Sequence, residues 1–140
     1  MAEFKAQANS SFKIPPQDND AEKALLGSLL LRPESFDEII DFIELESFYS
    51  DRHKSIYKAI LDLHKKSDPI DLLSVSTRLK ELKELERIGG ATYISEIVDM
   101  VPSAGNIKHY ATIVQKKSAL RDLIQSAEEV LDLGYQEAEE

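Results

Sequence analysis

Residues 106–133, NIKHYATIVQKKSALRDLIQSAEEVLDL, contain neither proline nor glycine and predict one long helix. Asn106 suits the N-cap of this helix, and Gly134 is expected to end it. At 1.5 Å per residue, 28 helical residues would extend about 42 Å. A compact domain of this size has a radius of gyration of roughly 14 Å. We therefore expect the helix to project beyond the body of the domain.

The apolar residues of this helix change face partway along it. Ile107, Tyr110, Ala111 and Val114 recur at helical spacing and predict one buried stripe. A second stripe is rotated from the first by about a third of a turn. It consists of Ile113, Leu120, Leu123, Ile124, Ala127, Val130 and Leu131. Two stripes on different faces indicate two neighbours: the body of the domain for the first, and something else for the second.

Charge divides the same helix. Its first part carries Lys108, Lys116, Lys117 and Arg121, and no acid lies between residues 107 and 121. Residues 122–140 hold seven acids and no base, so they account for −7 of the net charge of −9. The helix dipole favours the opposite arrangement. We interpret the pattern as favouring association with another helix, in a second copy or in the same protein. A solvated acidic end without a partner is the alternative.

The chain before residue 106 is also expected to be helical. Pro15 and Pro16 enforce an extended lead-in. Asn19 and Glu22 form a capping-box variant for a first helix that runs through the leucines ending at Leu31. A second helix is predicted over residues 33–43, with Phe36, Ile39, Ile40 and Ile43 on one face.

Three further elements follow before the long helix. Ser50 or Asp51 can cap a helix that ends before Pro69, and Asp71 can cap the next. Gly89 and Gly90 break the chain before a short helix that carries Tyr93. No segment shows the period-2 alternation of a strand. The predicted fold class is all-α, with a compact multi-helix head followed by a long helix.

Composition restricts the function. At 140 residues the chain is one domain, and it has no cysteine for a disulfide or a thiolate metal site. It lacks a membrane-length apolar stretch, a signal-peptide core and a phosphate-binding G-x-x-x-x-G-K motif. His53 and His64 are eleven residues apart, about 16 Å on one helix, so we expect core-edge histidines rather than metal ligands. We expect a cytoplasmic, non-enzymatic chain without a metal or cofactor and without membrane contact.

Five sequence blocks resemble one family in order and in spacing. They lie in IPPQDNDAEKALLGSLLL, FYSDRHKSIYKAILDL, DPIDLLSV and IGGATYISEIVDMVPSAGNIKHYATIVQKKSALRDLI. Together the motifs PPQ, HxxIYxAI, PIDL, GGxxY and VPSAxNIxxYAxIV are similar to the N-terminal domain of the bacterial replicative DNA helicase, the DnaB family. The resemblance covers about residues 14–135.

The resemblance implies a division of the chain. A flexible tail would occupy residues 1–13, the helical head 14–103, and the first helix of a helical hairpin 104–135. An acidic end, 136–140, would stop before the second hairpin helix. The family's ATPase domain, which uses ATP and Mg²⁺, would also follow. The absent second hairpin helix is therefore another explanation of the exposed stripe.

The resemblance also implies partners. In the family, pairs of these domains build a collar on a hexameric ring, and the collar receives the C-terminal domain of primase. A helicase loader is a further expected partner, and DNA would be contacted only through the full-length ring. By position, Tyr93, Ile124 and Val130 would contact primase. From the stripe and the charges, we add Ile113, Leu120, Lys116, Lys117 and Arg121 as residues for primase binding or self-association. A free-standing helical adaptor without a motor is the alternative function.

Overall fold

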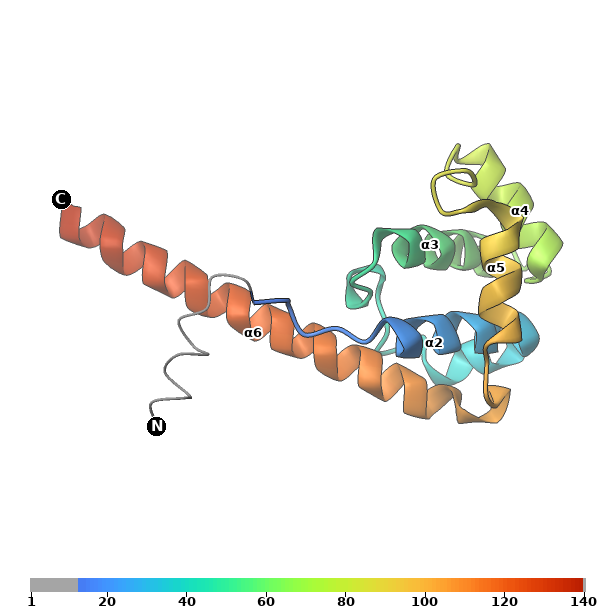
Figure 1. The fold of residues 1–140 in the computed structure, drawn as a ribbon, viewed down its shortest axis with the longest axis horizontal. Helices are drawn as coiled ribbons and strands as arrows, with labels where there is room; N and C mark the ends of the chain where they lie inside the picture. The colour runs from blue at the N-terminus through green and yellow to red at the C-terminus, as the bar shows by residue number, and fades with distance from the viewer. Residues whose placement is uncertain (1–12, 140) are drawn as a thin grey trace.

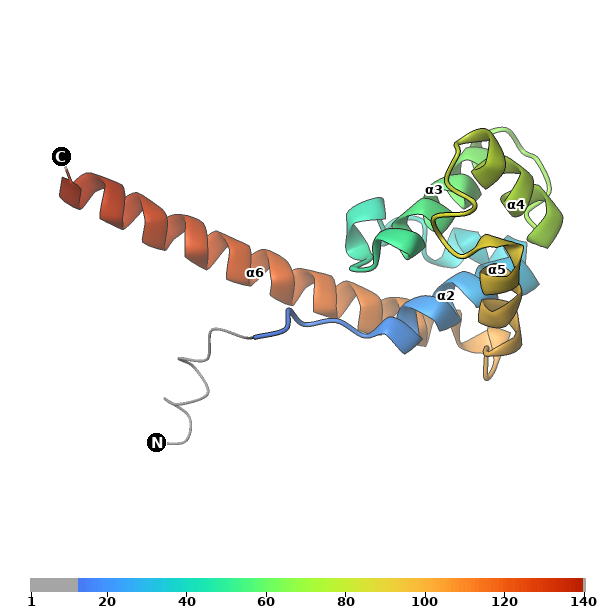
Figure 2. The ribbon, with the colours of Figure 1, turned by 45° about the horizontal axis from the view of Figure 1, so that its top comes forward.

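The computed structural model describes residues 13–139 as helices and turns, without a strand among them. Figures 1 and 2 show a helical head and a single long helix, α6, that leaves it. The all-α fold with a projecting helix is thus confirmed. Apart from Lys13, the tail predicted over residues 1–13 lies outside the described residues.

The central helix of the head is α2, Asn19–Leu31. It packs against α3 (Asp51–Lys65), α5 (Gly90–Asp99) and α6 (Ile107–Glu139). Its leucines at positions 25, 26 and 29 are fully buried, because neighbours cover several of its faces. Gly27 permits the closest of these contacts. A Cβ at this position would lie 2.3 Å from Val101 Cγ2 and 2.8 Å from the Ile97 carbonyl oxygen, so the chain at the end of α5 can approach only a glycine.

The start of α2 differs from the predicted capping box. Asp18, rather than Asn19, is the N-cap, and its carboxylate accepts a hydrogen bond from the Ala21 amide at 2.9 Å. Asn19 is the first helical residue. Glu22 is buried and bonds to residues of another segment, so it does not reach back to cap its own helix.

The prediction of one helix over residues 33–43 is also wrong in part. A 3-10 helix, η1, covers Pro33–Glu38, and turns follow it. Phe36, Ile39 and Ile43 reach the core as expected, whereas Ile40 is exposed. Acids stand three or four residues apart at positions 34, 37, 38 and 41, and like charges at this spacing disfavour a regular helix.

Three α-helices complete the head, together with the short 3-10 helix η2, Leu45–Ser47. They are α3, Asp51–Lys65; α4, Leu72–Glu81; and α5, Gly90–Asp99. The predicted cap of α4 is confirmed, because the Asp71 carboxylate accepts from the Ser74 amide at 2.7 Å. Gly89 stands before α5 with φ of 105°, a left-handed conformation that favours glycine.

The 3-10 helix η3, Ala104–Asn106, leads into α6, Ile107–Glu139. Gly134 does not end α6, contrary to prediction. A glycine inside a helix costs only about 1 kcal/mol, and the five residues after it continue the helix. At 33 residues α6 is about 50 Å long. None of the described helices is long and apolar enough to cross a membrane.

Tyr57 on α3 shows how the core is closed. Its ring lies 4.9 Å from that of Phe48, and its hydroxyl donates to the Ile43 carbonyl at 2.9 Å. Burial, and then the negative charge of Glu44, raise the pKa of the Tyr57 hydroxyl well above its ordinary value. The folded head therefore favours the neutral phenol.

This raised pKa predicts alkaline sensitivity. The unfolded Tyr57 ionises near pH 10, whereas the folded one stays neutral, so its stabilising contribution is complete below about pH 10 and is lost as the pH rises further. We expect the free energy of unfolding, measured by urea denaturation, to fall more steeply from pH 9 to pH 11 in the wild type than in Tyr57→Phe. Equal slopes for the two proteins would contradict this expectation.

Candidate interaction surface

The helix α6 leaves the head at Arg121. Before this point Ile107, Tyr110, Ala111 and Val114 are buried, as the first stripe predicted. From residue 122 to residue 138 every side chain is exposed. The protruding half of α6 in Figure 1 is therefore exposed to solvent over most of its length.

Large apolar side chains are frequent on this protruding half. Ile124 is 45% exposed and Val130 69% exposed. The other large apolar residues exposed from position 120 onward are Leu120, Leu123, Leu131, Leu133 and Tyr135. Contiguous exposed apolar surface on a soluble domain marks a site of association. Apart from Ile113, the second stripe predicted from the sequence is thus solvent-exposed in this chain.

The remaining predicted residues on α6 flank this surface. Ile113 is half-buried and packs against the head core, so it lies at the border between the two stripes. Lys116 is exposed, and Lys117 is half-buried. These residues and Leu120 lie on consecutive turns of α6, so the structure brings them together with Ile124.

A groove runs between α6 and the extended lead-in. It has a volume of about 910 Å³ and is the place where Ile124 meets the head. Its lining residues are Lys13, Ile14, Pro15, Pro16, Tyr49, Arg121, Ile124, Gln125 and Glu128. The two prolines that the sequence singled out therefore form one wall of the groove beside the exposed stripe.

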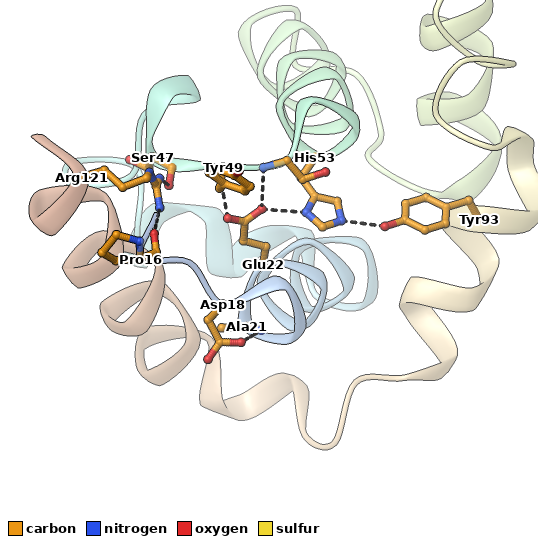
Figure 3. Close-up of polar contacts among 10 residues, drawn as sticks. Pro16, Asp18, Ala21, Glu22, Ser47, Tyr49, His53, Tyr93 and Arg121 are labelled. Atoms are coloured by element: carbon orange, nitrogen blue, oxygen red, sulfur yellow. Dashed lines mark hydrogen bonds and ion pairs between the residues drawn. The ribbon is translucent and has the colours of Figure 1, made fainter. Parts of the chain in front are cut away.

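Arg121 is engaged within the chain. Its guanidinium donates to the Pro16 carbonyl at 2.7 Å and to the Ser47 carbonyl at 2.9 Å, and it lies 5.5 Å from the centre of the Tyr49 ring (Figure 3). Arg121 thus ties the lead-in and the end of η2 to α6, at the last point where α6 meets the head.

Tyr93 lies apart from the α6 residues. Figure 3 shows it at the opposite end of the site from Arg121. Its ring is half-buried under the Arg52 guanidinium, 4.2 Å from the ring centre, and its hydroxyl is 2.7 Å from His53 Nε2. Tyr93 therefore belongs to a separate surface on α5, held in place from inside the head.

A buried polar cluster lies behind Tyr93 and was not predicted from the sequence. Glu22 and His53 are 2% and 1% exposed, and His53 Nδ1 lies 2.7 Å from Glu22 Oε1. The Glu22 carboxylate also accepts from the backbone amides of Tyr49 and Ser50, at 2.8 and 3.3 Å. Ser50, the N-cap of α3, makes no capping bond of its own, so Glu22 of α2 holds the chain that enters α3.

Glu22→Gln is expected to lower the free energy of unfolding by about 1–3 kcal/mol. An amide keeps the shape of the carboxylate but turns one of its two acceptors into a donor, which then faces a buried N–H group. Urea denaturation measures the change. Glu34→Gln is the control, because the Glu34 side chain is exposed and forms a surface ion pair with Arg32 at 3.5 Å. An equal effect in the two variants would contradict the structural role of Glu22.

The described residues contain no group of three or more histidines and acids that could hold a metal ion. His53 is engaged at both ring nitrogens, and His64 lies against Phe36 with ring centres 4.6 Å apart. Both side chains therefore belong to the packing of the head.

The fold places the chain among all-α domains with a compact head and a long projecting helix. Residues 14–116 match the family described as the DnaB-like helicase N terminal domain, and the chain belongs to this family. The resemblance seen in the sequence blocks is thereby confirmed.

Three similar proteins illustrate the relationship. The replicative DNA helicase DnaB of Geobacillus stearothermophilus is 39% identical over 130 residues, which are 93% of this chain and 29% of that protein. The N-terminal domain of DnaB helicase from Mycobacterium tuberculosis superposes with a TM-score of 0.88 at 37% identity, covering 91% of each chain. A DnaB-like replicative helicase, solved with attention to its interactions with primase, gives a TM-score of 0.74 at 30% identity. There the match covers 82% of this chain and 27% of that one.

Proposed function

We propose that this chain is the collar domain of a replicative DNA helicase, which assembles with other copies of itself and docks the C-terminal domain of primase. The observation that carries the proposal is the exposed apolar stripe of α6 beyond Arg121. Membership of the family supports it, and so does the similarity to a DnaB-like replicative helicase whose interactions with primase were studied.

The exposed stripe supports association because its solvation is costly. Burial of apolar surface contributes about 25 cal/mol per Å². A helix that keeps so many large apolar residues in water gains from any partner that covers them. The charge pattern suits a helical partner, because the basic part, 108–121, and the acidic part, 122–140, complement an antiparallel helix of the same pattern.

We assign two surfaces to this function. Ile124 and Val130 would serve as apolar anchors on α6, with Leu120, Lys116 and Lys117 around them. Tyr93 would contribute from α5, as a separate contact point. Ile113 and Arg121 have more of their surface inside the domain, and they would support the α6 surface from its border with the head.

We assign ATP hydrolysis and DNA unwinding to other parts of the protein. The Geobacillus relative is named a replicative DNA helicase and is more than three times as long as the segment matched here. A motor domain that uses ATP and Mg²⁺ would unwind DNA, and the collar would neither bind these cofactors nor catalyse a reaction. DNA contact through the whole ring, a loader as a further partner and a cytoplasmic location belong to the same proposal.

A free-standing adaptor is the second candidate that the sequence left open. The family match and the relatives do not favour it, because the similar proteins reported above are replicative helicases or their N-terminal domains.

Sedimentation velocity over a concentration series tests the proposal, with the chain alone and mixed with the C-terminal domain of the cognate primase. We expect a faster species in the mixture than in either protein alone. A chain that self-associates without forming a mixed species would remove primase docking from this segment. A monomer that binds nothing would favour the adaptor.

A further inference from the structure

A continuous row of contacts crosses the head between the two predicted partner surfaces. Figure 3 shows it running from Tyr93 on α5 through His53 and Glu22 to Tyr49 and Arg121. Its first half consists of two hydrogen bonds of 2.7 Å, which join the Tyr93 hydroxyl to His53 and His53 to Glu22. These residues come from α5, α3 and α2, so three helices meet in this half of the row.

His53 joins its two neighbours through its two ring nitrogens. A carboxylate oxygen accepts, so His53 Nδ1 donates to Glu22. The Tyr93 hydroxyl bonds to the other ring nitrogen, Nε2. The orientation of the His53 ring is therefore held from both sides, by Glu22 and by Tyr93.

The second half of the row runs through Ser47–Ser50. The Tyr49 and Ser50 amides donate to Glu22, at 2.8 and 3.3 Å. On its other side the same segment meets Arg121, which binds the Ser47 carbonyl at 2.9 Å and lies over the Tyr49 ring. Four consecutive residues therefore touch the buried carboxylate at one end and the exit point of α6 at the other.

Burial makes the hydrogen bonds of this row hard to replace. Glu22 and His53 are almost inaccessible to water, so a bond lost inside the head is not replaced by solvent. The carboxylate can move only if the amides of the Ser47–Ser50 segment move with it. A displacement of the His53 ring is therefore passed through Glu22 to the Ser47–Ser50 backbone, whose Ser47 carbonyl is bound by Arg121.

We propose that the Glu22–His53 pair and the Ser47–Ser50 segment couple the Tyr93 surface to the α6 arm. Occupation of the α5 surface at Tyr93 changes how firmly Arg121 and Pro16 hold α6 at its exit. The coupling is reciprocal, because linkage between two sites is symmetric. It is a property of this chain alone and does not depend on the identity of any partner.

Hydrogen–deuterium exchange of two single variants tests the coupling. Tyr93→Phe removes the hydroxyl but keeps the ring under Arg52, and we expect amide exchange to become about threefold faster or more at residues 117–124. Arg121→Gln removes the contacts at the other end, and we expect a comparable acceleration at residues 90–96 of α5.

Two matched variants separate coupling from general destabilisation. Tyr110→Phe removes another tyrosine hydroxyl, which donates to the Ser103 carbonyl at 3.2 Å and lies outside the row. Arg78→Gln removes another half-buried guanidinium, which contacts Asp62 at 2.9 Å. We expect neither control to accelerate exchange at the distant end of the row. The proposal is overturned if either test variant, or both, leaves amide exchange at the distant end of the row unchanged. It is also overturned if the control variants accelerate that exchange as much as the test variants do.

Discussion

Ile60→Asp is expected to destabilise the head by about 3–5 kcal/mol. Ile60 lies on α3 and has no exposed surface, so the new carboxylate would be buried in the core without a partner. The total stability of a domain is about 5–15 kcal/mol, so a loss of this size removes much of it. Circular dichroism during thermal unfolding should show a melting temperature far below that of the wild type, or no cooperative transition.

Leu73→Asp is the matched control for this variant. Leu73 lies on α4 and is 76% exposed, so the same new charge stays in water and should leave the melting temperature nearly unchanged. Similar shifts in the two variants would contradict the placement of Ile60 in the core.

Ile124→Asp is expected to weaken binding of the primase domain by about thirtyfold or more, which corresponds to the loss of one apolar interface anchor of about 2 kcal/mol. Because Ile124 is 45% exposed and lies at the edge of the head, beside the extended lead-in, the melting temperature should change little. Isothermal titration calorimetry measures the affinity, and thermal unfolding of the same samples measures the stability.

Gln136→Asp is the control for Ile124→Asp. It adds the same charge on the exposed half of α6, at a position that lies about a third of a turn away from both Ile124 and Val130 at 100° per residue. We expect it to leave primase binding within about twofold of the wild type. A large fall in melting temperature for Ile124→Asp would instead show that this side chain is buried. Equal binding by wild type and Ile124→Asp would remove Ile124 from the docking surface.

Local sequence signals predicted most of the helical framework. Asp71 identified the start of α4 because an N-cap acts on its own first turn, and Pro69 separated it from α3. The two stripes of α6 followed from periodicity alone. The structure buries the first and exposes the second, except for Ile113, which is half-buried. These features depend on residues within one or two turns of each other, so a single sequence contains the necessary information.

The buried contacts of the head depend on residues far apart in the sequence. Glu22 was assigned to its own helix end, because a capping-box pattern is local, whereas its partner His53 is 31 positions away. Arg121 was taken as a charge available to a partner, yet it binds the carbonyl of Pro16, 105 positions earlier. No local pattern indicates such pairs. For the Glu22–His53 pair, the available sign in the sequence was an acid, Glu22, among the apolar residues of α2.

Heteronuclear NMR of the ¹⁵N-labelled chain, titrated with the primase C-terminal domain, tests the proposed function most directly, because it reports each backbone amide separately. The docking surface proposed for α6 predicts shift changes or line broadening concentrated between Leu120 and Leu131, with a second set around Tyr93 on α5. Changes confined to α4 and the outer face of α3, with α6 unaffected, would contradict it.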